Sequence, residues 1–198
     1  MEKELVQFLE NFQVFTKEEL DMIVAHTSIK TFPKGTVLLN EGEVAKDCYL
    51  VLKGCIREYY IIDGVEKTTA FFTEGQPVNA FTSSAHAQAA KHFLVCAEEC
   101  VLTVSDQSLE QAMCERIPRL ETIIRQEVEK FTGELQDRLA LFMTSSPKQR
   151  FLKLMEDNPG LIGRVPQHQI ASYLGITPES LSRIKKRLYT KDQSTNTI

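Results

Sequence analysis

Apolar residues at the start of the chain recur every three or four positions, which is the spacing of an amphipathic helix. The pattern predicts two short helices between Glu2 and about Thr27, the second capped by Thr16 with Glu19 three residues on. Their apolar positions are Leu5, Phe8, Leu9, Phe12, Leu20, Ile23 and Val24. We expect both helices to pack on the segment that follows.

Between residue 29 and about residue 105 the pattern changes to short strand-like runs separated by breaks that contain glycine. The runs are Thr36–Leu39, Cys48–Leu52, Cys55–Ile62, Thr68–Phe72 and Phe93–Val104. Short strands at regular spacing with turn glycines are typical of an antiparallel sandwich or barrel. Asp63-Gly64 favours a hairpin between Tyr60 and Val65. We therefore expect an antiparallel β jelly roll.

A long helical seam begins at Pro118, after Ser105-Asp106. Charged residues flank its apolar positions, which are Leu120, Ile124, Val128, Phe131, Leu135, Leu139 and Phe142. This spacing suits the interface of a two-helix dimer, and equally a single amphipathic helix that lies on its own sheet. Periodicity alone does not choose between these two interpretations.

The charge of the chain divides at Ser145-Ser146-Pro147, a polar break that marks a domain boundary. Residues 1–144 carry 14 Lys and Arg against 23 Asp and Glu, whereas residues 145–198 carry 9 against 4. We divide the 198-residue chain into residues 1–117, 118–144 and 145–198. An acidic body with a basic end favours nucleic acid as the partner of the last part.

The segment 167–188 has the spacing of a helix-turn-helix motif. Ala171 supplies the small side chain where two helices touch, and Gly175 supplies the positive φ that the turn requires. Thr177 is a good N-cap for the second helix, whose first position is taken by Pro178. The apolar anchors are Ile170, Leu174, Ile176, Leu181 and Ile184.

If this second helix, at about 177–188, enters a major groove, its first outward side chains lie nearest the bases. Glu179 can accept a hydrogen bond from cytosine N4, and Arg183 can donate two to guanine O6 and N7. The expected base-facing residues are Pro178, Glu179, Ser180, Ser182 and Arg183. Phosphate contacts are expected from Gln167, His168, Lys185, Lys186 and Arg187, and Thr177 completes the DNA-binding set. The alternative is a helical hairpin with solvated charges.

The order of a turn-rich β region, a long helix and a terminal helix-turn-helix resembles the CRP/FNR family of bacterial transcription regulators. The motifs that carry the resemblance are Phe32-Pro33-Lys34-Gly35, Asn40-Glu41-Gly42-Glu43, Tyr49-Leu50-Val51-Leu52-Lys53-Gly54 and Thr177-Pro178-Glu179-Ser180-Leu181-Ser182-Arg183-Ile184-Lys185-Lys186. The resemblance implies an α+β fold with an N-terminal β jelly roll of the cyclic nucleotide-binding type, a long dimerisation helix and a C-terminal helix-turn-helix domain. In that domain Glu179 and Arg183 occupy the base-contacting positions.

The resemblance also implies a homodimer on a palindromic promoter site of double-stranded DNA, with RNA polymerase as a candidate further partner. After Leu188 the sequence has only Tyr189–Ile198. The β wing that commonly follows the recognition helix in this family is therefore expected to be reduced or absent.

Cyclic-AMP binders of this family hold the ribose and the phosphate with Gly-Glu and Arg-Ser pairs, and both pairs are replaced here. Asn79-Ala80 and Ala90-Lys91 stand where these pairs are expected. Lys91 is a point charge and cannot supply the bidentate fork of an arginine. We therefore predict an unidentified small-molecule effector other than cyclic AMP, and we identify no cofactor.

Other sensor chemistries find little support. Residues 1–47 contain no cysteine, so the cysteine cluster of the family's iron–sulfur sensors is missing. His86 and His92 are weak haem candidates, because a loop histidine is more often solvated than a ligand. Cys96 and Cys100 share one strand-like run and could meet a metal, but no second pair accompanies them. Phe71, Phe72, Phe81, Phe93 and Met113 either line an apolar pocket or belong to the core.

Two other function classes remain open. A cupin-like metal enzyme would need a set of metal-binding histidines at suitable spacing, and a ligand-binding adaptor would leave the base-reading side chains unused. No apolar run reaches the roughly 18–20 residues of a membrane span, and the first residues lack the pattern of a signal peptide. We predict a cytoplasmic DNA-binding regulator that is not an enzyme; no motif reveals its target sequence or whether it activates or represses.

Overall fold

The computed structural model describes residues 2–78 and 87–195. The chain opens with the two expected helices, α1 (Glu2–Glu10) and α2 (Lys17–His26). The Thr16 hydroxyl accepts a hydrogen bond from the Glu19 N–H, and the Glu19 carboxylate accepts one from the Thr16 N–H. This capping box fixes the start of α2. The apolar faces of both helices join one cluster, which contains Leu5, Leu9, Ile23, Leu52, Val101 and Ile117.

Two four-stranded antiparallel sheets follow and form the β-roll. One sheet has the order β1-β8-β3-β6 and the other β2-β7-β4-β5. The strands are β1 (Ser28–Phe32), β2 (Val37–Leu39), β3 (Cys48–Lys53), β4 (Ile56–Ile62), β5 (Val65–Phe72), β6 (Pro77–Val78), β7 (Phe93–Cys96) and β8 (Cys100–Ser105). Their facing side chains make a core that includes Val51, Ile56, Phe72, Leu94 and Leu102.

The hairpin prediction is confirmed. Ile62 pairs with Val65 at the end of β4 and β5, and the two turn residues, Asp63 and Gly64, have φ of 52° and 74°. Two successive positive φ values give the strands the twist that a two-residue hairpin needs.

The prediction of one continuous strand-like run over Phe93–Val104 is wrong. The structure breaks this run into β7 and β8, which are joined by a turn at Ala97-Glu98-Glu99. Cys96 and Cys100 therefore lie on two different strands, and both are buried. The residues of β7 and β8 are nearly all apolar whether they are buried or half-buried, so the sequence shows no alternation of apolar and polar residues that would mark the turn.

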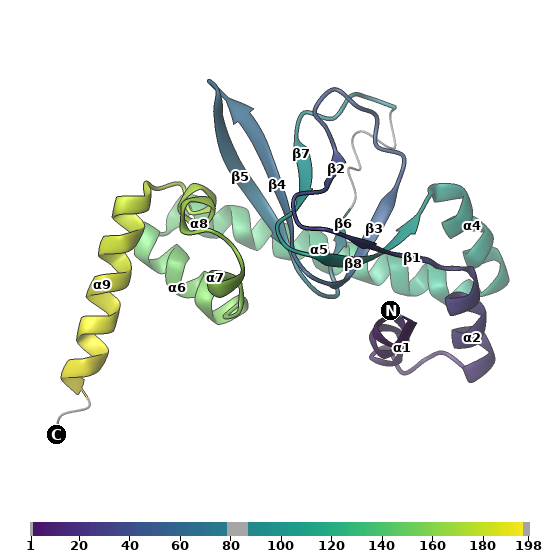
Figure 1. Ribbon diagram of the computed structural model, residues 1–198. Helices are drawn as coiled ribbons and strands as arrows, with labels where there is room; N and C mark the ends of the chain where they lie inside the picture. The colour runs from purple at the N-terminus through teal and green to yellow at the C-terminus, as the bar shows by residue number, and fades with distance from the viewer. Residues whose placement is uncertain (1, 79–86, 196–198) are drawn as a thin grey trace.

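The rest of the described chain is helical. Its elements are α4 (Gln107–Arg116), α5 (Pro118–Thr144), α6 (Pro147–Asp157), α7 (Leu161–Arg164), α8 (Gln167–Tyr173) and α9 (Pro178–Thr195). Figure 1 shows α5 spanning the length of the β-roll, with α1, α2 and α4 at one end and α6–α9 at the other. We call residues 147–188, from α6 into α9, the helical unit.

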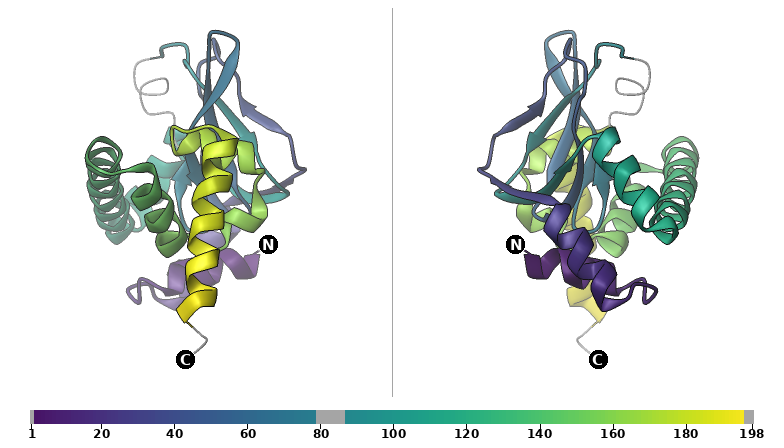
Figure 2. Two further views of the ribbon diagram at one scale, coloured as in Figure 1. Left: turned by 90° about the vertical axis from the view of Figure 1, so that its left-hand side faces the viewer. Right: turned by 90° about the vertical axis from the view of Figure 1, so that its right-hand side faces the viewer.

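The helical unit packs directly against the β-roll. Figures 1 and 2 show α8 beside the strand pair β4–β5, with α9 pointing away from the sheets. Cys55, Phe71 and Ala97 of the β-roll share one buried cluster with the unit's side chains, which are Phe151, Leu161, Val165, Ile170, Ala171, Leu174 and Leu181. One apolar cluster therefore joins the sheets to the unit.

Candidate DNA-reading surface

The turn between α8 and α9 has the geometry that the sequence predicts. Gly175 has a φ of +68°. Its N–H donates to the Ser172 carbonyl at 3.0 Å, and the Ile176 N–H donates to the Ala171 carbonyl at 3.0 Å. This pair of hydrogen bonds is a Schellman motif, which satisfies the last carbonyls of α8 and directs the chain into α9.

The expected apolar anchors hold the two helices together. Ile170, Ala171, Leu174 and Leu181 are at most 2% exposed, and Ile176 and Ile184 pack on the same cluster. Ala171 is completely buried at the helix contact, where a larger side chain would keep α8 and α9 apart. α8 and α9 are therefore held together by one apolar cluster, which also contains residues of the β-roll.

The first turn of α9 is capped and exposed. The Thr177 hydroxyl accepts a hydrogen bond from the Ser180 N–H at 3.3 Å, as expected of an N-cap, and Pro178 begins the helix. Thr177, Pro178, Glu179, Ser182 and Arg183 are exposed, while Ser180 is half-buried. The residues predicted to face the bases thus lie together on the surface at one helix end.

Glu179 and Arg183 lie one helical turn apart at this end. The pKa of the Glu179 carboxyl lies below its usual value. The causes are a hydrogen bond from the backbone N–H of Glu179, a hydrogen bond from the Thr177 hydroxyl and the positive charge of Arg183. The Arg183 Nη2 donates to the Ser180 hydroxyl at 3.1 Å. The helix start therefore presents one acceptor and one forked donor with their charges intact.

The residues predicted to contact phosphates flank this helix end on both helices of the motif. Gln167, His168, Lys186 and Arg187 are exposed, and Lys185 is half-buried. The Lys185 ammonium donates to the Gln167 amide oxygen at 3.1 Å. This contact ties the start of α8 to α9, so that the amide and the charges occupy one continuous surface.

Sequence analysis did not identify Arg150, which joins three helices. Its guanidinium donates to the Leu174 carbonyl from Nε and Nη2 at 3.2 and 2.9 Å, and from Nη1 to the carbonyls of Phe142 and Ser145 at 3.1 and 2.7 Å. These carbonyls lie at the ends of α8 and α5, where backbone acceptors lack helical partners. In the sequence, Arg150 looks like any solvated charge of an amphipathic helix, and no local signal marks it.

The seam predicted on α5 divides into two faces. Val128, Leu135 and Leu139 are 38%, 51% and 61% exposed, and Phe142 and part of Ile124 share this exposed stripe. Phe131 instead stacks on Phe72, with the ring centroids 6.4 Å apart, and Leu120 packs on the N-terminal cluster. The interpretation as a helix that packs on its own chain therefore holds for Phe131 and Leu120, whereas a dimer interface along the exposed stripe stays a prediction.

The position at which the family places its ribose-binding pair, Asn79-Ala80, lies outside the described residues, as do Phe81 and His86. Ala90 is buried, and its N–H and carbonyl pair with the backbone of Glu43 and Gly42 at 2.8 and 2.9 Å. Lys91, which follows it, is exposed. The backbone of Ala90 is thus already engaged with the β2–β3 loop.

His92 is not the solvated loop residue that the sequence suggests. Its side chain is 15% exposed, and its Nε2 lies 3.7 Å from a Glu58 carboxylate oxygen, beside the ring of Tyr60. Within residues 2–78 and 87–195, no three His, Cys, Asp or Glu side chains form a group that could hold a metal ion.

The aromatic residues considered as a pocket lining lie in separate places. Phe71 faces Tyr173 of α8, Phe72 lies in the β-roll core, and Phe93 stacks on Tyr59 with the centroids 4.9 Å apart. Met113 packs on the N-terminal cluster. Their role in packing is therefore the interpretation that the structure supports.

Comparison with known proteins agrees with this architecture. Residues 29–116 match the family model of the cyclic nucleotide-binding domain. No curated protein sequence matches the chain. The β-roll of this protein is therefore a cyclic nucleotide-binding-type domain, as the sequence motifs implied.

Solved structures with the same fold include three regulators. The c-di-GMP-responsive global regulator CLP of Xanthomonas campestris has 18% identity and a TM-score of 0.69, covering 89% of this chain and 93% of that chain. FixK2 of Bradyrhizobium japonicum has 18% identity and a TM-score of 0.68, covering 84% and 86%. The catabolite activator protein of Thermus thermophilus has 21% identity and a TM-score of 0.54, covering 91% and 87%.

The chain thus has the fold of the CRP/FNR regulators over most of its length, which confirms the predicted fold class. In the described residues no strand follows β8, and α9 continues to Thr195, beyond the expected end of the recognition helix. No helix in the described part is both long and apolar enough to cross a membrane.

Proposed function

We propose that this protein is a homodimeric transcription regulator that reads a palindromic site on double-stranded DNA through α9. The observation that carries the proposal is the first turn of α9. It is capped by Thr177, anchored beneath by the buried Leu181, and presents Glu179 and Arg183 to solvent. A helix end of this kind fits a major groove, where a carboxylate can pair with cytosine and a guanidinium with guanine.

The exposed stripe of α5 supplies the dimer interface. Val128, Leu135 and Leu139 form an unpartnered apolar line along a helix of 27 residues. A second copy with the same stripe would bury both lines by two-fold symmetry and would place two copies of α9 on one side of the dimer. We assign residues 1–117 to the sensor, 118–144 to dimerisation and 145–198 to DNA binding.

The effector of this regulator is a small molecule other than cyclic AMP. Ala90 stands where the family's phosphate-binding arginine is expected, and the exposed Lys91 stands where the serine that follows it is expected. Without that arginine the site lacks the bidentate fork that can hold a cyclic phosphate, and this replacement supports a different ligand chemistry.

The test is selection of bound duplexes from a random DNA pool by the purified full-length protein, at near-physiological salt. An enriched inverted repeat, with half-sites about one helical turn apart, is the expected result. The selected site then serves for two variants. Arg183→Ala should lose about 1–3 kcal/mol of discrimination at one base pair of each half-site, whereas Lys186→Ala should weaken binding to all sequences alike.

Other results would contradict base reading or favour a different class of protein. Equal losses on every duplex for both variants would contradict base reading by Arg183. Stoichiometric iron, zinc or manganese in the purified protein would favour a cupin-like enzyme. Weak binding to any duplex that does not change with salt would favour a ligand-binding adaptor, because phosphate contacts always make DNA binding salt-dependent.

A further inference from the structure

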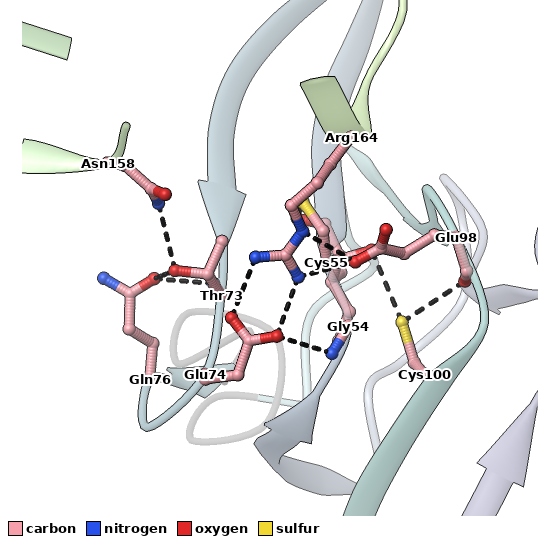
Figure 3. A network of polar contacts seen from close by, with 10 residues as sticks. Gly54, Cys55, Thr73, Glu74, Gln76, Glu98, Cys100, Asn158 and Arg164 are labelled. Carbon is pink, nitrogen blue, oxygen red and sulfur yellow. Dashed lines mark hydrogen bonds and ion pairs between the residues drawn. The ribbon is translucent and has the colours of Figure 1, made fainter. Parts of the chain in front are cut away.

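Arg164, the last residue of α7, reaches out of the helical unit into the β-roll. Figure 3 shows its guanidinium between the carboxylates of Glu74 and Glu98. Nη1 and Nη2 donate to the two oxygens of Glu74 at 2.9 and 2.8 Å. Nε donates to Glu98 Oε1 at 2.9 Å, and Nη2 contacts the same oxygen. One arginine thus holds two carboxylates, the first of them through a bidentate fork.

The two carboxylates belong to different turns of the β-roll. Glu74 lies in the turn between β5 and β6, and Glu98 lies in the turn between β7 and β8. Glu74 Oε1 also accepts a hydrogen bond at 2.9 Å from the N–H of Gly54, in the turn between β3 and β4. Two turns of the β-roll therefore contact one side chain of the helical unit directly, and a third turn, at Gly54, is linked to it through Glu74.

The charges of this network persist under ordinary conditions. Partial burial raises the pKa of the Glu74 carboxyl, but the hydrogen bonds from Arg164 and from the backbone outweigh it and leave the pKa below its usual value. The guanidinium side chain is only 24% exposed, so water competes weakly for its donors. A planar guanidinium that is held in this way restricts both the distance between the helical unit and the β-roll and the rotation of one relative to the other.

Three further hydrogen bonds join the helical unit to β5 and to the turn after it. The Asn158 amide donates to the Thr73 hydroxyl at 3.1 Å. The Ser172 hydroxyl of α8 accepts from the Thr68 N–H at 2.9 Å and donates to the Glu66 carbonyl at 3.3 Å. The shared apolar cluster supplies the buried area of the contact between the helical unit and the β-roll. The polar groups fix the orientation of the unit, because the strength of a hydrogen bond depends on its angle whereas apolar packing has no preferred direction.

We propose that Arg164 is a positioning residue that fixes the angle of α9 to the β-roll and thereby sets the half-site spacing that the dimer accepts. The inference rests on the proposed function. In a two-fold dimer the distance between the recognition helices depends on how each helical unit is seated on its own β-roll. One base pair changes the half-site separation by about 3.4 Å and the direction of the groove by about 35°. A helical unit that is loosely seated on its β-roll would still bind when the half-site spacing changes by one base pair, whereas a firmly seated unit would not.

The experiment compares full-length wild-type protein, Arg164→Met, Arg164→Lys and Glu98→Gln on one set of duplexes. The set holds the selected palindrome with the spacer between its half-sites lengthened or shortened by one and two base pairs, and a duplex with a single half-site. Arg119→Met is the matched control, because Arg119 also pairs with a glutamate, Glu19, at 3.3 Å, but at the start of α5, far along the chain from α9. Far-ultraviolet circular dichroism and thermal unfolding verify that each variant is folded.

The wild type and Arg119→Met should prefer one spacing. In Arg164→Met the ratio of the affinity for the best spacing to the affinity for spacings one base pair longer or shorter should fall by about fivefold. A helical unit that is not pre-positioned binds the best site less tightly, and it can adapt its position to the other spacings. Affinity for the single half-site should stay unchanged. Arg164→Lys and Glu98→Gln, which keep part of the network, should give intermediate ratios.

An unchanged spacing ratio in folded Arg164→Met would overturn the inference while leaving the proposed function intact. Equal losses on the palindromes and the single half-site would also overturn it, because they would indicate a general structural role. If the wild type selects no sequence at all, the proposed function fails, and the positioning role of Arg164 fails with it.

Discussion

Phe142 of α5 packs against Gly175 in the turn of the helix-turn-helix. Its Cζ and Cε2 atoms lie 3.0 and 3.3 Å from the point that a β-carbon on Gly175 would occupy. The Arg150 guanidinium lies over the same ring, with Cζ 4.6 Å from the ring centroid, and donates to the carbonyl of Leu174. The long helix α5 and the turn between α8 and α9 therefore meet in a close contact, where a β-carbon would force the Phe142 ring to move.

Gly175→Ala should destabilise the protein by about 1–2 kcal/mol from the positive φ alone, and by more if the Phe142 ring cannot move. Urea unfolding measures the change. Gly163→Ala in α7 is the control, because a β-carbon there meets nothing within 4 Å and its φ is not positive. Equal unfolding midpoints for the two variants would contradict this account of the joint.

Charge on the exposed stripe of α5 should separate the proposed dimer. In Leu135→Glu/Leu139→Glu, two carboxylates per chain would have to leave water at the interface, which is strongly unfavourable without partners. Sedimentation equilibrium should show a monomer, and selective DNA binding should fall with it. Leu109→Glu, at an equally exposed leucine of α4, should remain a dimer. Dimers of unchanged stability in the double variant would exclude this stripe as the interface.

Gly133→Ala should stabilise the protein by about 1 kcal/mol, because alanine has a higher helix propensity than glycine. Gly133 lies inside α5, and a β-carbon there meets nothing within 4 Å. Urea unfolding at fixed protein concentration measures the gain, and sedimentation should show the same oligomer as the wild type. A loss of stability would mean that a partner helix approaches closely at Gly133.

Glu74 should make the stability of the protein depend on pH in the acid range. Its pKa in the folded state is below the usual value because Arg164 and the backbone donate hydrogen bonds to it. A group with a lowered folded pKa contributes stability that is present above its unfolded pKa, at about 4.3, and is lost as the pH falls through the folded pKa. The difference in unfolding free energy between wild type and Glu74→Gln should therefore be largest near pH 7 and shrink below about pH 4. A difference that stays constant between pH 7 and pH 3 would argue against the ionised pair.

Features that depend on a few neighbouring residues were predicted from the sequence. The capping box at Thr16, the Asp63-Gly64 hairpin and the Gly175 turn all follow from hydrogen bonds and φ values within about four residues. The break at Ala97-Glu98-Glu99 escaped prediction because both flanking strands are almost entirely apolar in sequence, on their half-buried as well as their buried positions.

Arg150 and Arg164 are residues whose roles the sequence does not predict. Arg150 is one of several charged residues of α6, and Arg164 is the single charged residue of the short helix α7; nothing in the sequence marks either as the centre of a hydrogen-bond network. Their partners are the carbonyls of Phe142, Ser145 and Leu174 in one case, and Glu74 and Glu98, 90 and 66 residues away in the chain, in the other. Only the folded chain brings these groups together.

The sequence by itself determined the order of the elements, the turn and cap of the helix-turn-helix, and which side chains α9 carries at its start. These are local properties, because helix periodicity, capping and backbone conformation depend on near neighbours. The tertiary structure decided which face of α5 stays free, since Phe131 and Leu135 fit the same periodicity but only Phe131 meets Phe72. It also decided how the helical unit sits on the β-roll, because that contact joins side chains whose meeting depends on the path of the whole chain.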